Sequence, residues 1–237
     1  MKSVSVKLSF ILYILHPALT IAQTHQSKVF VVGEMKNVMW KGELSGILDI
    51  DTISNKTNLY GLGPVEFLSG EILILNGITY KSVVTSDSTM QVIKTDQVKA
   101  PFFGYAFIET WKIYDLPANI ITGQQLEEYL NTKADIYPGP YFFKLSGEIE
   151  TAKIHIVNLP TGSQVHSPEE AHQGLTVFNL ENKSVEILGF YSQKHKAILT
   201  HHDTNLHLHL ITDDRLEMGH LEEIRFKAGS VKLFMPE

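Results

Sequence analysis

Residues 205–220 read NLHLHLITDDRLEMGH and hold three histidines, arranged as a His-x-His pair followed after ten residues by a third. In an extended strand successive side chains point to opposite faces, so His207 and His209 share one face and the intervening leucines share the other. This stretch therefore predicts a strand with an imidazole face and a core face. The DDR cluster and the glycine that follow predict a turn, which returns His220 on a neighbouring strand close to the first two histidines.

Three imidazoles that converge in this way can bind a metal ion. Neutral imidazole is the commonest metal ligand in proteins, and three histidines with an open fourth position are typical of catalytic zinc. The chain has no cysteine, which excludes a closed thiolate site. The spacing alone leaves a second interpretation open, in which the histidines are the polar outer face of a half-exposed strand. Cupin-like oxygenases also carry His-x-His on a strand, but they need a glutamate soon afterwards, and residues 211–214 offer only acids in an expected turn.

Composition limits the function classes. The chain has 237 residues, of which 43% are hydrophobic and 19% charged, as in a globular protein with a sizeable core, in one large domain or two small ones. Its net charge is -6 and it has no basic run, which argues against a nucleic-acid partner. Nine of the eleven histidines fall between His155 and His220, so we look for chemistry in the second half.

The first 22 residues have the pattern of a secretory signal. Two early lysines, Lys2 and Lys7, precede the apolar run 8–15, and the segment ends in small residues at Ala22. The run is shorter than the about 20 residues that a membrane span needs, and no later stretch is long and apolar enough. A membrane anchor or a first buried helix is the alternative. We expect a signal peptide over residues 1–22 and an exported protein, periplasmic or extracellular.

A second informative stretch is YGLGPVEFLSGEILILNGITY, residues 60–80. It predicts a glycine-rich loop, a strand over residues 71–75, a tight Asn-Gly turn and a return strand over 78–83, because Asn-Gly supplies the positive φ angles of a type I′ hairpin. Glu71 stands at the start of the first strand. On local grounds alone it is an ordinary outward-facing carboxylate.

The rest of the chain is mostly strand-like. Thr122-x-x-Gln125 has the form of a capping box and predicts a helix to about Lys133. Further strands are expected over residues 28–32, 141–145, 148–157, 175–180, 185–191 and 230–235, with 175–180 and 185–191 paired as a hairpin. The prediction is a strand-rich α+β protein with few helices. A boundary near residues 116–121 divides it into an N-terminal lobe, 23–118, and a C-terminal metal-binding lobe, 119–237.

Three segments resemble the acetolactate decarboxylase family. They are GLGPVEFLSGEILILNG, GFYS at residues 189–192, and HLHLITDDRLEMGH, in family order from about Val29 to His220. The resemblance implies two tandem lobes with mixed or antiparallel sheets, a homodimer, and Zn²⁺ held by the three histidines. It also implies a lyase of acetoin biosynthesis, which converts 2-acetolactate (2-hydroxy-2-methyl-3-oxobutanoate) to acetoin and CO2.

That chemistry gives the matched residues their expected roles. Loss of CO2 from a β-keto acid leaves electrons on the former carbonyl, and a Lewis-acid cation stabilises the developing charge. Glu71 matches the family's active-site glutamate in its LxGE segment, so the resemblance implies that it delivers a proton or positions the water that does so.

Two positions depart from the family pattern. Pro64 stands where the family has threonine, and His155 aligns with an arginine that helps to hold the substrate. Arginine is always charged and binds carboxylates with two hydrogen bonds, so His155 as the substrate-binding residue predicts weaker or altered binding. The alternative function is therefore an exported metal-binding relative with altered substrate or lost catalysis. No late glutamate is carried over from the family, and Glu237 is only a remote candidate.

Overall fold

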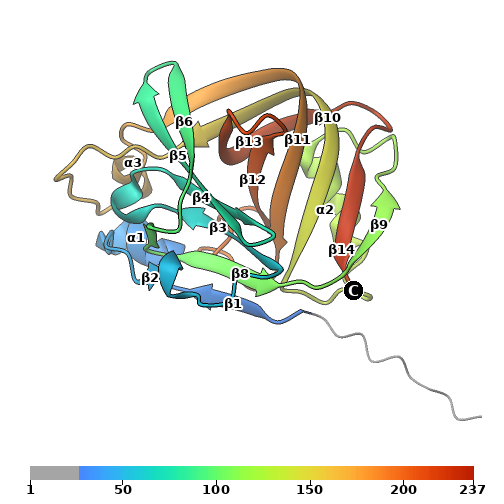
Figure 1. Cartoon of the computed structure of the whole chain (residues 1–237), viewed down its shortest axis with the longest axis horizontal. Helices are drawn as coiled ribbons and strands as arrows, with labels where there is room; N and C mark the ends of the chain where they lie inside the picture. The colour runs from blue at the N-terminus through green and yellow to red at the C-terminus, as the bar shows by residue number, and fades with distance from the viewer. Residues whose placement is uncertain (1–26) are drawn as a thin grey trace, which may run out of the picture.

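The structure is a computed structural model that describes residues 27–237. The expected signal peptide, residues 1–22, lies outside the described residues. Within them the chain forms two six-stranded sheets, a two-stranded ribbon and three short α-helices (Figure 1). All strand pairings in the two large sheets are antiparallel, which confirms the predicted strand-rich α+β fold with two sheet lobes.

The first sheet comes from the N-terminal half, in the order β1-β8-β3-β4-β5-β6. These strands are β1 (Val29–Val32), β8 (Phe103–Phe107), β3 (Leu59–Pro64), β4 (Glu71–Leu75), β5 (Ile78–Ser86) and β6 (Thr89–Lys94). A ribbon of β2 (Leu48–Asp49) and β7 (Lys99–Ala100) and the 3-10 turns at Ile50–Thr52 and Glu66–Leu68 complete this half. The predicted hairpin is present between β4 and β5, with positive φ at both Asn76 and Gly77.

The second sheet has the order β11-β12-β13-β10-β14-β9. Its strands are β11 (Thr176–Tyr191), β12 (Leu206–Thr212), β13 (Met218–Phe226), β10 (Tyr141–Ile156), β14 (Lys232–Pro236) and β9 (Trp111–Asp115). Because β10 also pairs with β11, the strands β10 to β13 close into a four-stranded barrel. β9 precedes the predicted lobe boundary yet joins this sheet through β14; the boundary itself stays a prediction.

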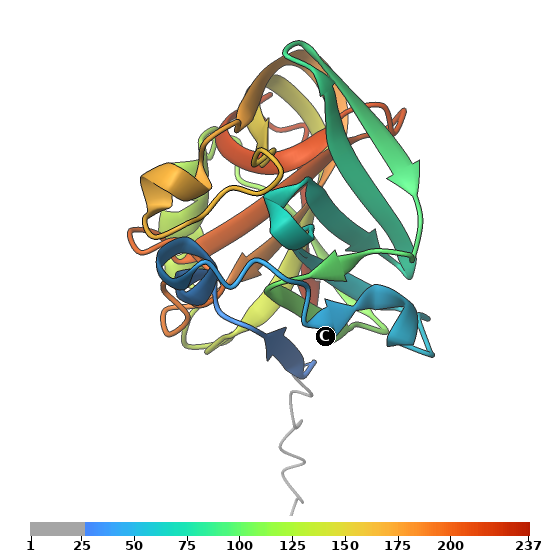
Figure 2. The same cartoon turned by 90° about the vertical axis from the view of Figure 1, so that its left-hand side faces the viewer.

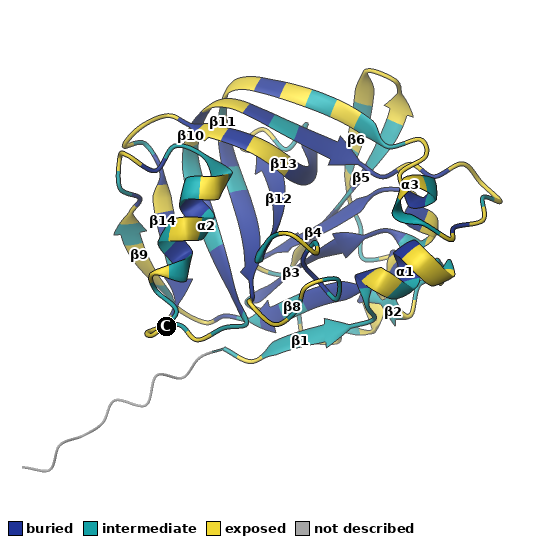
Figure 3. Cartoon of the chain, turned by 180° about the vertical axis from the view of Figure 1, so that it is seen from behind, coloured by how far each residue is buried: buried dark blue, intermediate teal, exposed yellow. Residues whose placement is uncertain are grey.

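Side-chain alternation builds the cores. Leucines of β12 fill the barrel together with aromatic residues of β10 and β11, and α2 (Gly123–Asn131) packs Leu126 and Leu130 against them. A second core lies between the two sheets, where Leu73 of β4 meets Phe190 and Ile211. Figure 3 shows the strands of this central region as buried and the outer side of α2 as exposed.

The helices lie at the periphery. α2 begins with the predicted capping box, since Thr122 Oγ1 accepts from the Gln125 N–H and the Gln125 side chain accepts from the Thr122 N–H. α1 (Met35–Lys41) and α3 (Pro168–Ala171) lie side by side over the core between the sheets (Figure 2). No helix within residues 27–237 is long and apolar enough to cross a membrane.

Three local predictions were wrong. The expected glycine-rich loop is strand β3, whose glycines admit the ring of Phe103: a Cβ on Gly61 would lie 2.6 Å from it. The expected break at Gly147 is the middle of the continuous strand β10, and the glycine is needed because the Ser230 carbonyl passes 2.4 Å from where a Cβ would be. The expected hairpin over 175–191 is the single strand β11, in which Asn182 bends the strand with a φ of +51° instead of reversing it.

Close packing at Gly189 links the GFYS segment to the barrel. A Cβ there would lie 2.2 Å from the Phe143 ring, its partner in the β10–β11 ladder. We expect Gly189→Ala to lower the free energy of unfolding by about 1–3 kcal/mol through overpacking, measured by urea denaturation. The control is Gly123→Ala in α2, where the nearest atom would lie at 3.7 Å, and it should not destabilise the protein. Equal free energies of unfolding for Gly189→Ala and the parent would contradict this prediction and show that the Phe143 ring can move aside.

Candidate metal centre

Strand β12 presents its two histidines to the first sheet. Leu206, Leu208 and Leu210 point into the barrel core, whereas Ile211 belongs to the core between the sheets. His207 and His209 share the face of Ile211 because strand side chains alternate. The predicted division into an imidazole face and a core face is therefore present, although the imidazole face is buried between two sheets and not half-exposed.

The antiparallel return of β13 brings the third histidine to the same place. His220 is the ladder partner of His209, after a turn at residues 213–217. Gly219, expected in the turn, is the β13 partner of Leu210 instead. One ring nitrogen from each of His207, His209 and His220 lies within 4.8 Å of the others, and the Nε2 atoms of His207 and His209 are 3.2 Å apart.

The three rings are held in the form that binds metal. The Leu199 carbonyl accepts from Nδ1 of His207 at 2.6 Å, so the proton sits on Nδ1 and the Nε2 lone pair faces the other two rings. Burial lowers the pKa of all three imidazoles, that of His209 to about 3. Three neutral nitrogen donors without a thiolate suit a divalent cation such as Zn²⁺ and leave room for further ligands.

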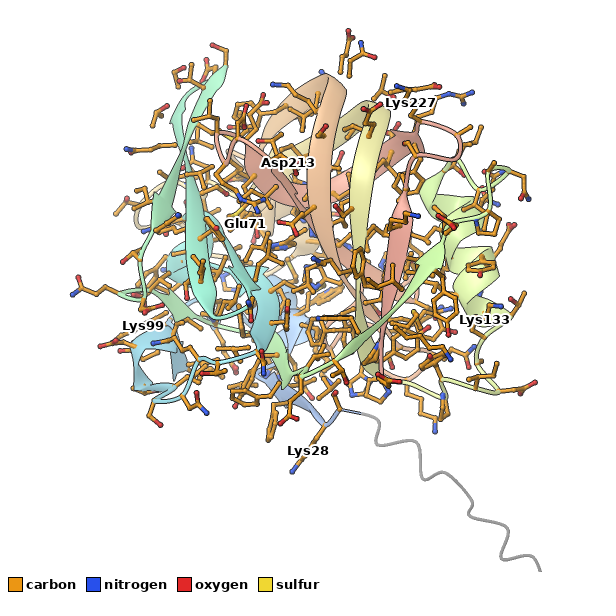
Figure 4. All side chains as sticks on the ribbon, turned by 45° about the vertical axis from the view of Figure 1, so that its right-hand side comes forward. Lys28, Glu71, Lys99, Lys133, Asp213 and Lys227 are labelled. Atoms are coloured by element: carbon orange, nitrogen blue, oxygen red, sulfur yellow. The ribbon has the colours of Figure 1, made fainter. Side chains whose placement is uncertain are left out.

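Glu71 reaches the histidines from the opposite sheet. In β4, Glu71 and Leu73 face the second sheet, while Ile72 faces away from it. Oε2 of Glu71 lies 3.6 Å from Nε2 of His209, and Oε1 accepts from the Val157 N–H at 3.2 Å. Figure 4 shows Glu71 within the molecule, whereas the labelled Lys28, Lys99 and Lys133 lie at its edge. Burial raises the pKa of the Glu71 carboxyl well above its usual value and favours the protonated acid.

A bulge in β13 provides His155 with an acidic hydrogen-bond partner. Between the pairs Ile154–Leu221 and Lys153–Glu223, β13 has one extra residue, Glu222. Its carboxylate accepts from Nδ1 of His155 at 2.9 Å and forms an ion pair with Lys153 at 2.8 Å. These two partners hold the pKa of Glu222 at about 2.

His155 in turn lies beside the three converging histidines. Its ring stacks on that of His220 with centroids 4.6 Å apart and an interplanar angle of 23°. The structure therefore brings together in one site all five residues that the sequence predicted: Glu71, His155, His207, His209 and His220. With Nδ1 of His155 engaged by Glu222, Nε2 is the ring atom left for another partner.

A cavity of about 790 Å³ opens beside His220. His155 and His201 line it, and the His201 ring stands edge-on to His220 with centroids 5.2 Å apart. His172 also lines this cavity, and it is exposed, as is His166. The polar stretch over residues 160–173 predicts solvated histidines at both positions, which agrees with this exposure. Sequence reasoning missed His201 and Glu222; the clustering of histidines in the second half was the only signal for the former.

Two further candidate positions, Pro64 and Glu237, contribute no polar group to this site. Pro64 ends β3 opposite Glu71 in the β3–β4 ladder, without an N–H or hydroxyl to offer. The backbone N–H of Glu237 donates to the Thr110 carbonyl, and Glu237 is not among the residues that line the cavity.

Known proteins share this sequence pattern and this fold. A sequence profile of the alpha-acetolactate decarboxylase family matches residues 29–235. The chain belongs to this family. Two members with curated descriptions, the alpha-acetolactate decarboxylases of Brevibacillus brevis and Methanosarcina mazei, are 25% and 24% identical over 198 and 195 residues. The matched stretches cover 83% and 81% of this chain, but only 66% and 64% of those proteins, just under two thirds of their length.

Solved structures support the same fold. The acetolactate decarboxylase of Bacillus subtilis subspecies spizizenii superposes with a TM-score of 0.71 at 21% identity, covering 88% of this chain and 86% of that one. A Staphylococcus aureus protein of unknown function, similar to alpha-acetolactate decarboxylase, reaches 0.68 at 14% identity and covers 88% and 85%. At these identities the likeness establishes the fold.

We expect the three histidines to bind one divalent cation. Parent protein loaded with Zn²⁺ should retain one ion per chain after gel filtration, and its melting temperature should fall on chelation, because ligands that bind only the folded state add about 2.7 kcal/mol at 100 times Kd. His209→Asn should lose both effects, while His202→Asn, on an exposed neighbouring loop, should keep them. Elemental analysis and thermal melting check this. Full zinc retention by His209→Asn would contradict the assignment.

Proposed function

We propose that this chain is a zinc-dependent decarboxylase that converts 2-acetolactate, or a close 2-hydroxy-3-oxo acid, to an acyloin and CO2. The observation that carries the proposal is the buried carboxyl of Glu71, 3.6 Å from one of three converging neutral imidazoles. Membership of the acetolactate decarboxylase family supports the reaction class. The pattern of residues 1–22 supports action after export, and a homodimer stays a prediction of the family resemblance.

His207, His209 and His220 would hold the cation. A zinc ion held there would supply Lewis acidity that stabilises the negative charge developing on the substrate. The histidines themselves contribute a rigid set of neutral donors, since His207 is fixed by Leu199 and His220 is packed between His155 and His201. They therefore need no reorganisation when the cation and substrate arrive.

Glu71 is the proposed proton donor. In the reaction the bond between C1 and C2 breaks, CO2 leaves, and the electron pair passes into the C2–C3 unit and the former keto oxygen. A proton must then add at C2. Burial raises the pKa of the Glu71 carboxyl, so it can be a proton donor near neutral pH, and a cation on the adjacent histidines would oppose this shift. The Val157 N–H fixes one carboxyl oxygen and leaves the other toward His209.

His155 is the substrate-facing residue in place of an arginine. The bulged Glu222 orients its ring through Nδ1, and His155 lines the cavity. A single imidazole nitrogen can donate one hydrogen bond to a carboxylate, where a guanidinium donates two. Looser binding of the carboxylate is compatible with this reaction, because that group must depart as CO2.

Replacement of Glu71 tests the mechanism. We expect purified zinc-loaded parent to form acetoin from racemic acetolactate and Glu71→Gln to lower kcat by about 100- to 10,000-fold, the usual contribution of a positioned acid. Zinc content should be unchanged. Glu109→Gln, on an exposed loop, is the matched control and should keep full activity. No acetoin from the parent above a chelated sample would refute the proposed reaction, and near-normal kcat in Glu71→Gln would refute the role of Glu71.

A second candidate function is metal binding without catalysis. Pro64 and His155, which replace the family's threonine and arginine, favour it. His155→Arg and Pro64→Thr, singly and combined, separate the two candidates. If the parent is an enzyme, it is active already and His155→Arg changes mainly KM. If catalysis was lost, acetoin forms only with the double variant. Zinc content should be equal in all four proteins.

A further inference from the structure

Strands β12 and β13, which carry the three histidines, separate from each other at the histidines. β12 and β13 pair at only three positions: His209–His220, Leu210–Gly219 and Ile211–Met218. Beyond His220, β13 pairs with β10, while the earlier part of β12 pairs with β11 alone. The barrel is therefore open between these two strands, and the opening begins at the pair His209–His220.

The cavity beside His220 occupies this opening. Leu206 and Leu208 of β12 line one side, and Leu221 and Ile224 of β13 line the other. These four side chains keep 5–7% of their surface accessible, whereas Leu210, where the strands still pair, is fully buried. These apolar side chains form one part of the cavity wall, and polar residues that include Gln124, Asp203, Thr204, Glu222 and Glu223 form the rest.

Helix α2 closes the far side. Thr122, just before α2, bridges to Arg225 of β13, and Glu127 accepts from the Asn205 N–H at 2.8 Å, directly before β12. The start of the helix is thus tied to both strands across the opening. One end of the cavity carries His155, His201 and His220, and the other carries Thr122 and Glu127.

Acetolactate does not account for this space. Its polar groups belong at the imidazole end, and the only alkyl substituent at its C2 is a methyl group. A cavity of about 790 Å³ falls in the range that accepts much larger ligands, about 300–1,000 Å³. The part of the wall made by Leu206, Leu208, Leu221 and Ile224 gives water few hydrogen-bond partners, so covering it with an alkyl group is favourable.

We propose that the site takes 2-hydroxy-3-oxo acids whose C2 carries a linear alkyl chain longer than ethyl, which lies between β12 and β13 while the acid group faces His155. This rests on the proposed function. The reaction balances as for acetolactate: the C1–C2 bond breaks, CO2 leaves with no change of external oxidant or reductant, and a proton adds at C2. The product from a pentyl substrate is 3-hydroxyoctan-2-one.

Kinetics with two substrates tests the inference. We expect zinc-loaded parent to act on both 2-hydroxy-2-methyl- and 2-hydroxy-2-pentyl-3-oxobutanoate, with kcat/KM at least tenfold higher for the pentyl acid, since each buried methylene contributes a factor of about four. Activity on the methyl acid with a lower kcat/KM for the pentyl acid would overturn the inference and leave the proposed function intact. No activity on either acid would overturn both.

A larger side chain in the cavity wall tests where the alkyl chain binds. Ile224→Phe should reduce kcat/KM for the pentyl acid by about tenfold or more and change that for the methyl acid by less than about twofold, as expected for steric discrimination in an apolar pocket. The methyl acid thus reports correct folding. Ile113→Phe, on the exposed face of β9, is the matched control. An equal loss for both acids in Ile224→Phe would overturn the placement.

A binding measurement makes the result independent of turnover. The corresponding 2,3-dihydroxy acids lack the keto group and cannot lose CO2 in this way. Calorimetry with zinc-loaded parent should give tighter binding of the pentyl than of the methyl dihydroxy acid, and Ile224→Phe should remove the difference. Equal affinity of the parent for both analogues would count against the alkyl site.

Discussion

The pairing of His209 with His220 is the constraint on which the site depends. It is one rung of a ladder of only three residue pairs between β12 and β13. The rung sets two ligand nitrogens side by side, and the period of two along β12 adds His207 on the same face. A shift of register by one residue would turn the imidazoles into the barrel and the leucines toward Glu71. The leucine core of the barrel therefore enforces the convergence of the three histidines.

Burial gives these groups their chemical character. His207, His209 and Glu71 are almost fully enclosed between two sheets, where the charged form of each is disfavoured. Burial therefore favours neutral imidazoles and a protonated carboxyl, the two states that the proposed reaction requires. Backbone hydrogen bonds oppose this effect at two of these groups: Leu199 accepts from His207, and Val157 donates to Glu71. Each fixes one atom and leaves the other toward the centre.

Sequence patterns predicted the features that local chemistry determines. The alternation of His207 and His209 with leucines, the Asn-Gly hairpin after Glu71, and the Thr122 capping box are all present. Features that depend on tertiary contacts could not be predicted. Gly147 resembles a turn residue, but the chain just before β14 passes directly over it, which the sequence does not reveal. Glu222 reads as an ordinary strand glutamate, and only the bulge turns it toward His155. The edge-on approach of His201 depends on a loop without a periodic pattern.

The shortness of the β12–β13 ladder connects ligand geometry with access. A longer ladder would hold the histidines equally well but would seal the barrel at Leu208 and Leu221. Because the strands separate directly after His220, that ligand lies at the boundary between the buried centre and the cavity, with His155 and His201 on either side of its ring. A substrate that enters there meets imidazoles at one end and leucine side chains along its length. In the proposed reaction, the same opening would admit the reacting group and select the size and polarity of the chain attached to it.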